Sequence, residues 1–302
     1  MKSLFDGAFS AGKDVKQNQV VEQAKGFLTQ NNDVEFIARE SSSITLVTVR
    51  EGLLPSVLII NGFLSQDGEE VLDWLSVVDK VYPNNKVIHV RWNAGYFTDI
   101  VRDDGIATRD DSAADKLLEA AKLAINMTPE GVAALVGELV TDKLVGHWKK
   151  SFNETLHAGH DLAKIIQHDP CLHGSIVMGY SLGAKVACQT LNHLDANQIS
   201  TCYLLAGAVS AKAEQWSSIL NKHTELQLIN CYSDNDDILK SADGAGMLFD
   251  HAPAGLACIE NQHSEQVMNL DVSTFTFGHM NFKNEKLGSA LANIKNKTML
   301  CL

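Results

Sequence analysis

Short apolar runs alternate with amphipathic segments along the chain after residue 42. Residues 44–49 (ITLVTV) and 56–60 (SVLII) have the composition of β-strands, and the second is apolar throughout, as in strands buried on both faces. Residues 69–81 place five apolar side chains on one helical face, and residues 86–92 (KVIHVRW) form the next predicted strand. This strand–helix–strand unit predicts parallel strands joined by a right-handed crossover, and therefore an α/β fold with a mostly parallel central sheet flanked by helices.

Other segments depart from this simple alternation. Residues 1–42 are polar and compatible with helix, and we expect them to form an N-terminal helical cap on the domain 43–302. Residues 95–130 are rich in Asp and Arg before a short helical stretch, which indicates a helical insertion within that domain. Residues 130–148 and 152–166 carry apolar stripes that predict two crossover helices packed on the sheet. The alternative for this region is a lid or a membrane-contacting helix.

The strongest chemical signal is Gly179-Tyr180-Ser181-Leu182-Gly183. It joins the apolar run 175–180 (SIVMGY) to the amphipathic segment 182–194, so the serine stands on a strand-to-helix turn. The flanking glycines let strand and helix approach closely around a strained serine. Ser181 Oγ would then lie at the carboxyl end of the sheet, where the helix N-terminus favours negative charge. We expect Ser181 to be a nucleophile.

A serine hydroxyl needs a base and an orienting carboxylate, which in this kind of fold follow in the order Ser, Asp, His. Residues 225–232 (ELQLINCY) predict a strand that ends in an acidic loop. Residues 272–277 (VSTFTF) predict another strand, and His279 follows it after Gly278. Of the 11 histidines in the chain, only His279 follows a strand, a glycine and the acidic loop. We therefore expect His279 to be the base.

The acidic loop offers Asp234, Asp236 and Asp237 as orienting acids. Asp236 is the expected partner of His279. Asp234 is the alternative acid, although its place directly after the strand suits it to start the turn by bonding backbone N–H groups. Residues 238–239 return the chain to the core, which leaves Asp237 to face water.

The developing oxyanion requires two N–H donors. Leu182, directly after the nucleophile, would supply the first. Phe63 would supply the second, from the segment 61–65 (NGFLS) that follows the strand 56–60. Gly62 permits the close backbone approach that this role needs, and an ordinary turn would also explain a glycine there.

Charge and cysteine content exclude several classes of partner. The net charge of −12 and the pI near 5.3 are unfavourable for neutralising phosphates, so we expect no nucleic-acid partner. The six cysteines are scattered and form no C-x-x-C, which gives no sign of a zinc site or a disulfide framework. We expect reduced thiols, no metal and no cofactor.

Hydrophobic runs long enough to cross a bilayer are missing from the sequence pattern. Residues 1–13 contain charges and no apolar core of the kind found in secretion signals. The longest uncharged stretches, such as 171–184, are too short or too polar for a membrane span. We expect a soluble, cytoplasmic protein without a transmembrane segment. Export by a route without a cleavable signal leaves no such pattern.

Four segments together resemble the transmembrane-and-coiled-coil-domain-containing family, also called domain of unknown function 726: residues 61–65 (NGFLS), 179–185 (GYSLGAK), 230–236 (NCYSDND) and 278–279 (GH). The resemblance covers roughly residues 45–290. It implies an α/β-hydrolase fold of the lipase-like branch, and Asn235-Asp236 matches the N-D pair of that family. The chain departs from the family in having no membrane-spanning run.

These observations predict a serine hydrolase that cleaves carboxylic esters through an acyl-enzyme, with lipid-like acyl esters as substrates, as in lipases and phospholipases. A small-ester carboxylesterase or thioesterase is the alternative within enzymes, and a non-catalytic hydrolase-fold binding protein is the alternative outside them. The expected partner is an acyl-ester or lipid small molecule, with transient membrane-surface contact as an open alternative. The pocket walls should come from residues 95–130 and 240–268, including the apolar segment 244–256.

Overall fold

The computed structural model describes residues 42–63, 65, 71–95, 129–244, 252–260 and 265–300. Within these ranges the strands are β1 (Ile44–Arg50), β2 (Leu53–Ile60), β3 (Asn85–Trp92), β4 (Ser175–Tyr180), β5 (Ile199–Leu205), β6 (Gln227–Tyr232) and β7 (Val267–Asp271). The helices are α2 (Leu72–Val81), α5 (Pro129–His168), α6 (Leu182–His193), α7 (Ala213–Lys222), α8 (Asp237–Gly244) and α9 (Glu285–Leu300). Short 3-10 turns, η2 (Pro170–Leu172) and η3 (His279–Asn281), complete the described elements.

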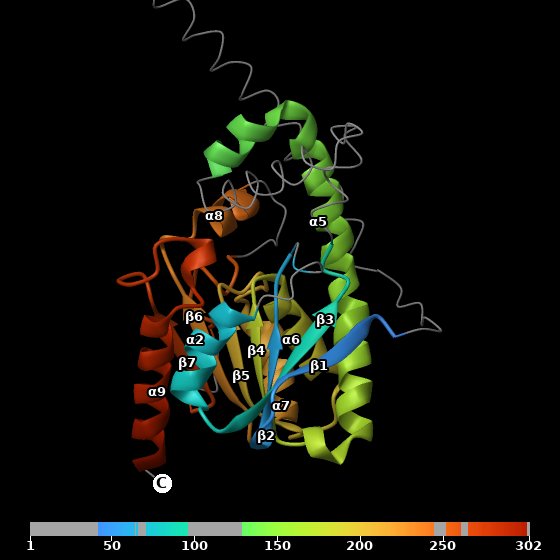
Figure 1. Ribbon diagram of the computed structural model, residues 1–302, viewed down its shortest axis with the longest axis vertical. Coiled ribbons are helices and arrows are strands. Elements are labelled where there is room, and N and C mark those ends of the chain that lie inside the picture. Colours follow the sequence, from blue (N-terminus) through green and yellow to red (C-terminus); the bar gives the residue numbers. More distant parts are fainter. Residues whose placement is uncertain are drawn as a thin grey trace, which may run out of the picture.

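All seven described strands belong to one sheet, in the order β1-β3-β2-β4-β5-β6-β7 (Figure 1). β1 is antiparallel to β3, and the other neighbouring strands are parallel. Helices pack beside the sheet, with α2 against α9 and α5 against α6. This arrangement is the α/β-hydrolase fold, as the sequence predicts.

The direction of the crossovers reverses between β2 and β4. The chain moves from β2 to β3 through α2, and it moves in the opposite direction from β4 to β5 through α6. Because both crossovers are right-handed, α2 and α6 cover opposite faces of the sheet. The loops at the carboxyl ends of β2 and β4 therefore diverge, and open α/β sheets bind ligands at such a switch point. Asn61-Gly62-Phe63 follows β2 and Ser181 follows β4 at this place.

Apolar packing on both faces fixes the central strands. Residues 57–60 of β2 have no exposed surface, and every residue of β4 is buried. α2 covers β2 with Trp74, Val77 and Val78, which are also fully buried. Each aliphatic side chain of this set contributes roughly 1.5–3 kcal/mol by leaving water. The elements that carry the candidate site thus rest on fully buried strands and a buried helix face.

The expected strand at residues 272–277 is wrong. The strand at this edge is β7, and Val272 ends the pairing by donating its N–H to Tyr232 O at 2.9 Å. Thr276 N–H then bonds Val272 O at 3.0 Å, which closes a turn over the alternating VSTFTF segment. The residues of this segment alternate between polar and apolar as in a strand, but they form a turn in which Val272 and Thr276 are buried.

The two helices expected at 130–148 and 152–166 are a single helix, α5. The polar residues Lys149-Lys150-Ser151 that separate the two apolar stripes include no proline or glycine, so nothing in them stops the helix. α5 runs alongside the sheet and continues past the carboxyl ends of the strands (Figure 1). No helix in the described part of the chain is long and apolar enough to span a membrane.

Several expectations fall on residues for which no structure is described. The N-terminal cap, apart from residue 42, and the insertion between residues 96 and 128 lie outside the described ranges. Most of the apolar segment 244–256 does so too. The five described cysteines are free thiols: Cys171, Cys188, Cys202, Cys231 and Cys258.

Candidate active site

Ser181 occupies a strained turn between β4 and α6. Its φ of 56° and ψ of −122° lie in a region that L-residues rarely adopt. A Cβ at Gly183 would lie 2.2 Å from Ile60 O, and one at Gly179 would lie 2.5 Å from Gly183 O. Only glycine therefore fits at positions 179 and 183, because the atoms that a Cβ would meet there belong to the backbone.

Backbone hydrogen bonds hold this turn in place. Ser181 N–H donates to Leu205 O at 3.0 Å, and Ser181 O accepts from Ala184 N–H and Ala208 N–H, both at 3.1 Å. The serine side chain is 8% exposed. These bonds offset the cost of the unusual dihedral angles and keep the hydroxyl at the carboxyl edge of the sheet.

A continuous hydrogen-bond path connects Ser181, His279 and Asp236. His279 Nδ1 lies 2.6 Å from Asp236 Oδ2, and His279 Nε2 lies 2.9 Å from Ser181 Oγ. An ionised carboxylate only accepts hydrogen bonds, so Nδ1 carries the proton of the neutral ring. Nε2 is then the acceptor for the Ser181 hydroxyl. The geometry matches that of a nucleophile, a general base and an orienting acid.

Asp236 differs from its acidic neighbours in burial and in contacts. Its side chain has no exposed surface, and its Oδ1 accepts the N–H of Leu239 at 2.9 Å. Asp234, the alternative acid, contributes its carbonyl oxygen to Lys240. The Asp237 side chain is 64% exposed and pairs with Lys240. Among the three aspartates, only Asp236 contacts His279.

Tyr180 supports the histidine from the strand that carries the nucleophile. Its hydroxyl donates to His279 O at 2.9 Å, and the two rings are 5.1 Å apart. Burial raises the pKa of Tyr180 well above its usual value, and the nearby carboxylates of Asp236 and Asp73 raise it further. The phenol therefore remains a hydrogen-bond donor. Sequence analysis does not single out this residue, although its place beside Ser181 is a usable signal.

The segment after β2 lies directly against the nucleophile. A Cβ on Gly62 would lie 2.7 Å from Ser181 Cβ and 3.1 Å from Ser181 Oγ. Ser65 Oγ donates to Gly62 O at 2.7 Å, which orients the peptide that carries Phe63 N–H. Neither Phe63 N–H nor Leu182 N–H donates to another described residue. Both expected oxyanion donors thus remain free for a ligand within the described structure.

Metal ligands do not gather at this site. No group of three or more His, Cys, Asp or Glu side chains suited to a metal ion occurs among the described residues. The hydrogen bond between His279 and Ser181 has a geometry suited to proton transfer from the hydroxyl to the imidazole.

A family model described as a protein of unknown function (DUF726) matches residues 116–297, which is more than half of the chain. The chain belongs to the DUF726 family. The matched region of this DUF726 protein includes Ser181, Asp236 and His279, and the segment after β2 lies before it. No curated protein matches the chain.

Several solved structures are similar to this chain at low sequence identity and with TM-scores below 0.5. The mouse alpha/beta hydrolase domain-containing protein 10 is 10% identical with a TM-score of 0.40, and the alignment covers 87% of this chain and 98% of that one. An esterase domain from Rhodothermus marinus is 10% identical with a TM-score of 0.38, covering 84% and 98%. A carboxylesterase from Bacillus subtilis is 9% identical with a TM-score of 0.36, covering 95% and 96%. Such distant likenesses carry no argument about activity.

Proposed function

We propose that this DUF726 protein is a serine ester hydrolase with Ser181 as nucleophile, His279 as general base and Asp236 as the orienting acid. The observation that carries the proposal is the unbroken path from Asp236 through His279 to Ser181, with both hydrogen bonds below 3 Å. The positive φ of Ser181 supports it, because backbone strain at a serine between a strand and a helix is a feature of catalytic turns.

The reaction begins with attack of Ser181 Oγ on the ester carbonyl carbon while His279 Nε2 takes the hydroxyl proton. The carbonyl π electrons move to oxygen, and the N–H groups of Leu182 and Phe63 stabilise the oxyanion. Collapse expels the alcohol, which receives the proton from His279, and leaves an acyl group on Ser181. Water attacks this acyl-enzyme by the same route and releases the carboxylic acid, which restores the serine.

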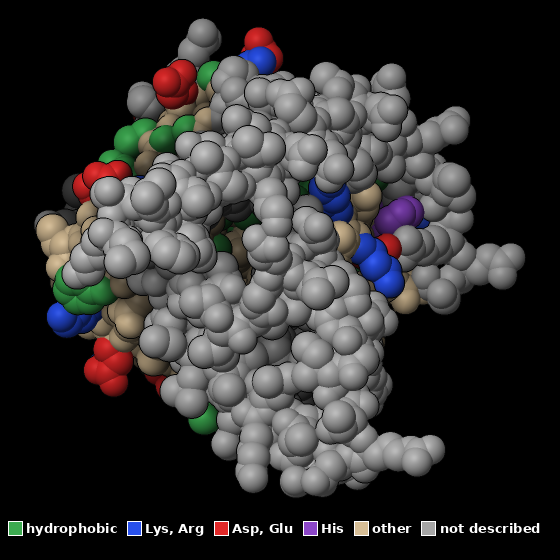
Figure 2. Space-filling view, turned by 90° about the horizontal axis from the view of Figure 1, so that it is seen from above, with side chains coloured by type: hydrophobic (Ala, Val, Ile, Leu, Met, Phe, Trp, Pro, Cys, Tyr) green, Lys and Arg blue, Asp and Glu red, His purple; other side chains and the backbone are tan. Residues whose placement is uncertain are grey.

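A lipid-like acyl ester is the proposed substrate class. Two large apolar side chains flank the histidine: Phe277 is 73% exposed and Met280 is 47% exposed. Exposed apolar side chains next to the candidate base in the sequence favour an apolar substrate. In Figure 2, which views the molecule from above, the described hydrophobic side chains that can be seen lie mainly towards the left, interspersed with acidic side chains. A small-ester esterase or a thioesterase would use the same chemistry with a shorter acyl chain.

Labelling with a fluorophosphonate tests the proposal, because only an activated serine reacts with it. Intact-mass spectrometry should find one adduct on the wild-type protein and none on Ser181→Ala. Ser200→Ala is the control. Ser200 lies on β5, donates its hydroxyl to Gly174 O and is outside the site. An adduct on Ser181→Ala would show that Ser181 is not the nucleophile. A folded wild-type protein without any adduct would favour the non-catalytic alternative.

A further inference from the structure

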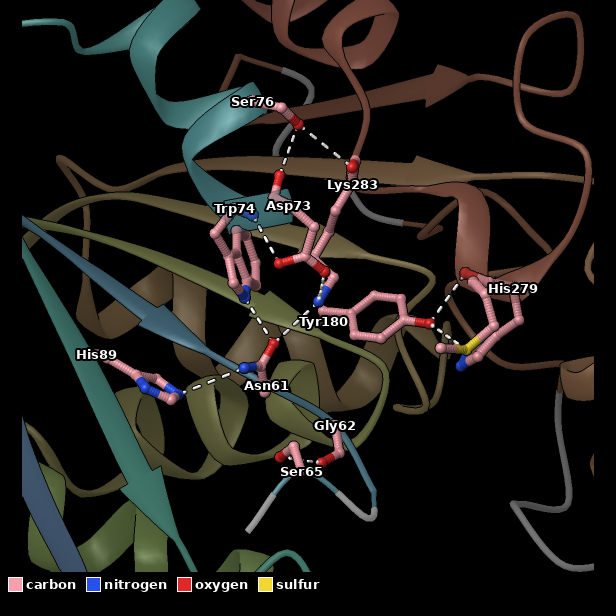
Figure 3. Close-up of polar contacts among 11 residues, drawn as sticks. Asn61, Gly62, Ser65, Asp73, Trp74, Ser76, His89, Tyr180, His279 and Lys283 are labelled. Atoms are coloured by element: carbon pink, nitrogen blue, oxygen red, sulfur yellow. Dashed lines mark hydrogen bonds and ion pairs between the residues drawn. The ribbon is translucent and has the colours of Figure 1, made fainter. Parts of the chain in front are cut away.

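A buried polar network lies beneath the loop that carries Phe63, and its centre is Asn61 (Figure 3). The Asn61 side chain is 5% exposed, and its Oδ1 accepts from Trp74 Nε1 at 2.6 Å and from Lys283 Nζ at 3.0 Å. The Asn61 carbonyl oxygen accepts from Trp92 Nε1 at 2.9 Å. Side chain and backbone of Asn61 are therefore both fixed at the point where the chain leaves β2.

The orientation of the Asn61 amide follows from its other neighbour, His89. Burial, together with the positive charges of Arg91 and Lys283, lowers the pKa of His89 to about 4. His89 is thus neutral at physiological pH, and its Nε2, 3.4 Å from Asn61 Nδ2, accepts from the amide. Asn61 Oδ1 consequently faces the Lys283 ammonium and the Trp74 indole.

Lys283 links the two loops that meet at the nucleophile. Its side chain is 10% exposed and pairs with Asp73 on α2. Its ammonium lies 4.7 Å from the centre of the Tyr180 ring, and Tyr180 in turn bonds His279 O. Burial lowers the pKa of Lys283, and the Asp73 carboxylate opposes that shift. Lys283 lies in the segment after His279, and its side chain contacts both Asn61, at the start of the loop after β2, and Tyr180, the residue before Ser181.

We infer that Lys283 and Asn61 are positioning residues of the oxyanion site: the Lys283 ammonium holds Asn61, and Asn61 holds the Gly62–Phe63 peptide against Ser181. This inference rests on the proposed ester hydrolase function. The close approach of Gly62 to Ser181 leaves the loop little freedom on one side. The hydrogen bonds of Asn61 and Ser65 restrain it on the other.

Loss of such restraint should act on the transition state more than on substrate binding. The oxyanion forms only after attack, so a displaced Phe63 N–H weakens stabilisation of the intermediate while the substrate still binds. Removal of an oxyanion donor itself costs roughly 10²- to 10³-fold in kcat. A donor that is misplaced rather than removed should cost about 10- to 100-fold.

Lys283→Met is the decisive variant, because it removes the charge and keeps most of the apolar stem. Lys295→Met is its matched control. Lys295 Nζ also donates to a carbonyl oxygen, that of Val81 at 2.9 Å, and lies 4.0 Å from the centre of the Tyr82 ring. Lys295 is, however, away from the site. The assays are hydrolysis of p-nitrophenyl butyrate and inhibition by an alkyl trifluoromethyl ketone, whose adduct with the serine carries an oxyanion. We expect Lys283→Met to lose about 10- to 100-fold in kcat and in affinity for the ketone, with KM within about threefold. Lys295→Met should match wild type.

Other results separate failure of the inference from failure of the proposed function. A wild-type protein that neither hydrolyses the ester nor takes up fluorophosphonate removes the function itself. An active wild type with a folded Lys283→Met of unchanged kcat and ketone affinity overturns only the positioning role. Lys283→Gln, which restores a donor without charge, is measured in parallel in case the Met variant does not fold. If both Lys283 variants lose the fold while Lys295→Met keeps it, the role of Lys283 is structural and the inference is also overturned.

Discussion

Asp236 Oδ2 lies 2.6 Å from His279 Nδ1, although 43 positions separate the two residues in the chain. The contact is buried, with Asp236 fully enclosed and His279 7% exposed. A buried carboxylate at this distance holds the imidazole in one tautomer and stabilises the imidazolium that forms during attack. The neighbouring Asp234 and Asp237 make no such contact.

Asp236→Asn should keep the fold and lower kcat by roughly 10³- to 10⁴-fold, because the amide no longer favours the working tautomer. Asp234→Asn and Asp237→Asn are matched controls from the same loop and should cost about tenfold or less on the same scale. The measurement is kcat on p-nitrophenyl butyrate for the three folded variants. A collapse at Asp234 with Asp236→Asn near wild type would transfer the orienting role to Asp234.

Ser181 and Asp236 could be chosen from the sequence because each closely follows a strand, and the carboxyl ends of parallel strands meet at one edge of a sheet. His279 was chosen by chain order and by an expected strand at 272–277 that forms a turn in the structure. Asn61 also follows a strand, but nothing in the sequence indicated its contact with Lys283. The two residues are 222 positions apart, and their contact depends on how the segment after His279 packs against β2.

The fold was predictable where the hydrophobic pattern was compatible with only one type of secondary structure. The apolar runs of β2 and β4 lie between glycine-containing turns, and both strands end where the sequence indicates. Polar and apolar residues alternate in the segment 272–277 as they would in a strand, yet the segment forms a turn after β7. The alternation does not indicate whether the backbone N–H and C=O groups pair with a neighbouring strand. β5, α7 and α9 were not recognised from the pattern.

Phe277 and Met280 should determine the preference for acyl chain length. Replacing both by serine should lower kcat/KM for p-nitrophenyl laurate about tenfold, which corresponds to roughly 1.4 kcal/mol of lost apolar contact, and leave the acetate unchanged. Met268→Ser is the control, because Met268 is also exposed but lies on β7. Equal wild-type rates on acetate and laurate would instead favour the small-ester alternative.

Gly183 should be required for packing of the nucleophile helix against β2. In Gly183→Ala the new Cβ would lie 2.2 Å from Ile60 O and 2.7 Å from Asn61 O, so the backbone must move. We expect a loss of about 1–3 kcal/mol in the free energy of unfolding, measured by urea denaturation, together with reduced kcat. In Gly146→Ala on α5 the added methyl would meet no described atom outside the neighbouring turns of the helix within 4 Å, and the variant should gain about 0.5–1 kcal/mol. Equal stability of Gly183→Ala and wild type would contradict the close approach.

The buried charge of Lys185 should lower the free energy of unfolding at neutral pH, and this effect should become smaller as the pH rises. Its ammonium lies 4.0 Å from the centre of the Phe152 ring, and burial lowers its pKa to about 8, with Cys188 opposing the shift. Below about pH 8 the lysine is protonated in both states, and the folded state bears the full cost of burying the charge. Between that pH and the ordinary lysine pKa the unfolded chain binds more protons than the folded one, so the stability contributed by this group rises with pH.

Lys185→Met removes this titration and keeps the apolar stem. At pH 7 the variant should be more stable than wild type by about 1–2 kcal/mol, because the relieved burial cost exceeds the lost cation–π contact of roughly 1 kcal/mol. The difference between the two proteins should shrink from pH 8 towards pH 10.5, because over this range the folded lysine is deprotonated while the unfolded lysine still binds protons. Urea denaturation of both proteins at pH 7, 9 and 10 measures this difference, and titration of groups common to both cancels. A difference that stays constant over this range would show that Lys185 keeps an ordinary pKa and that its burial costs the fold nothing.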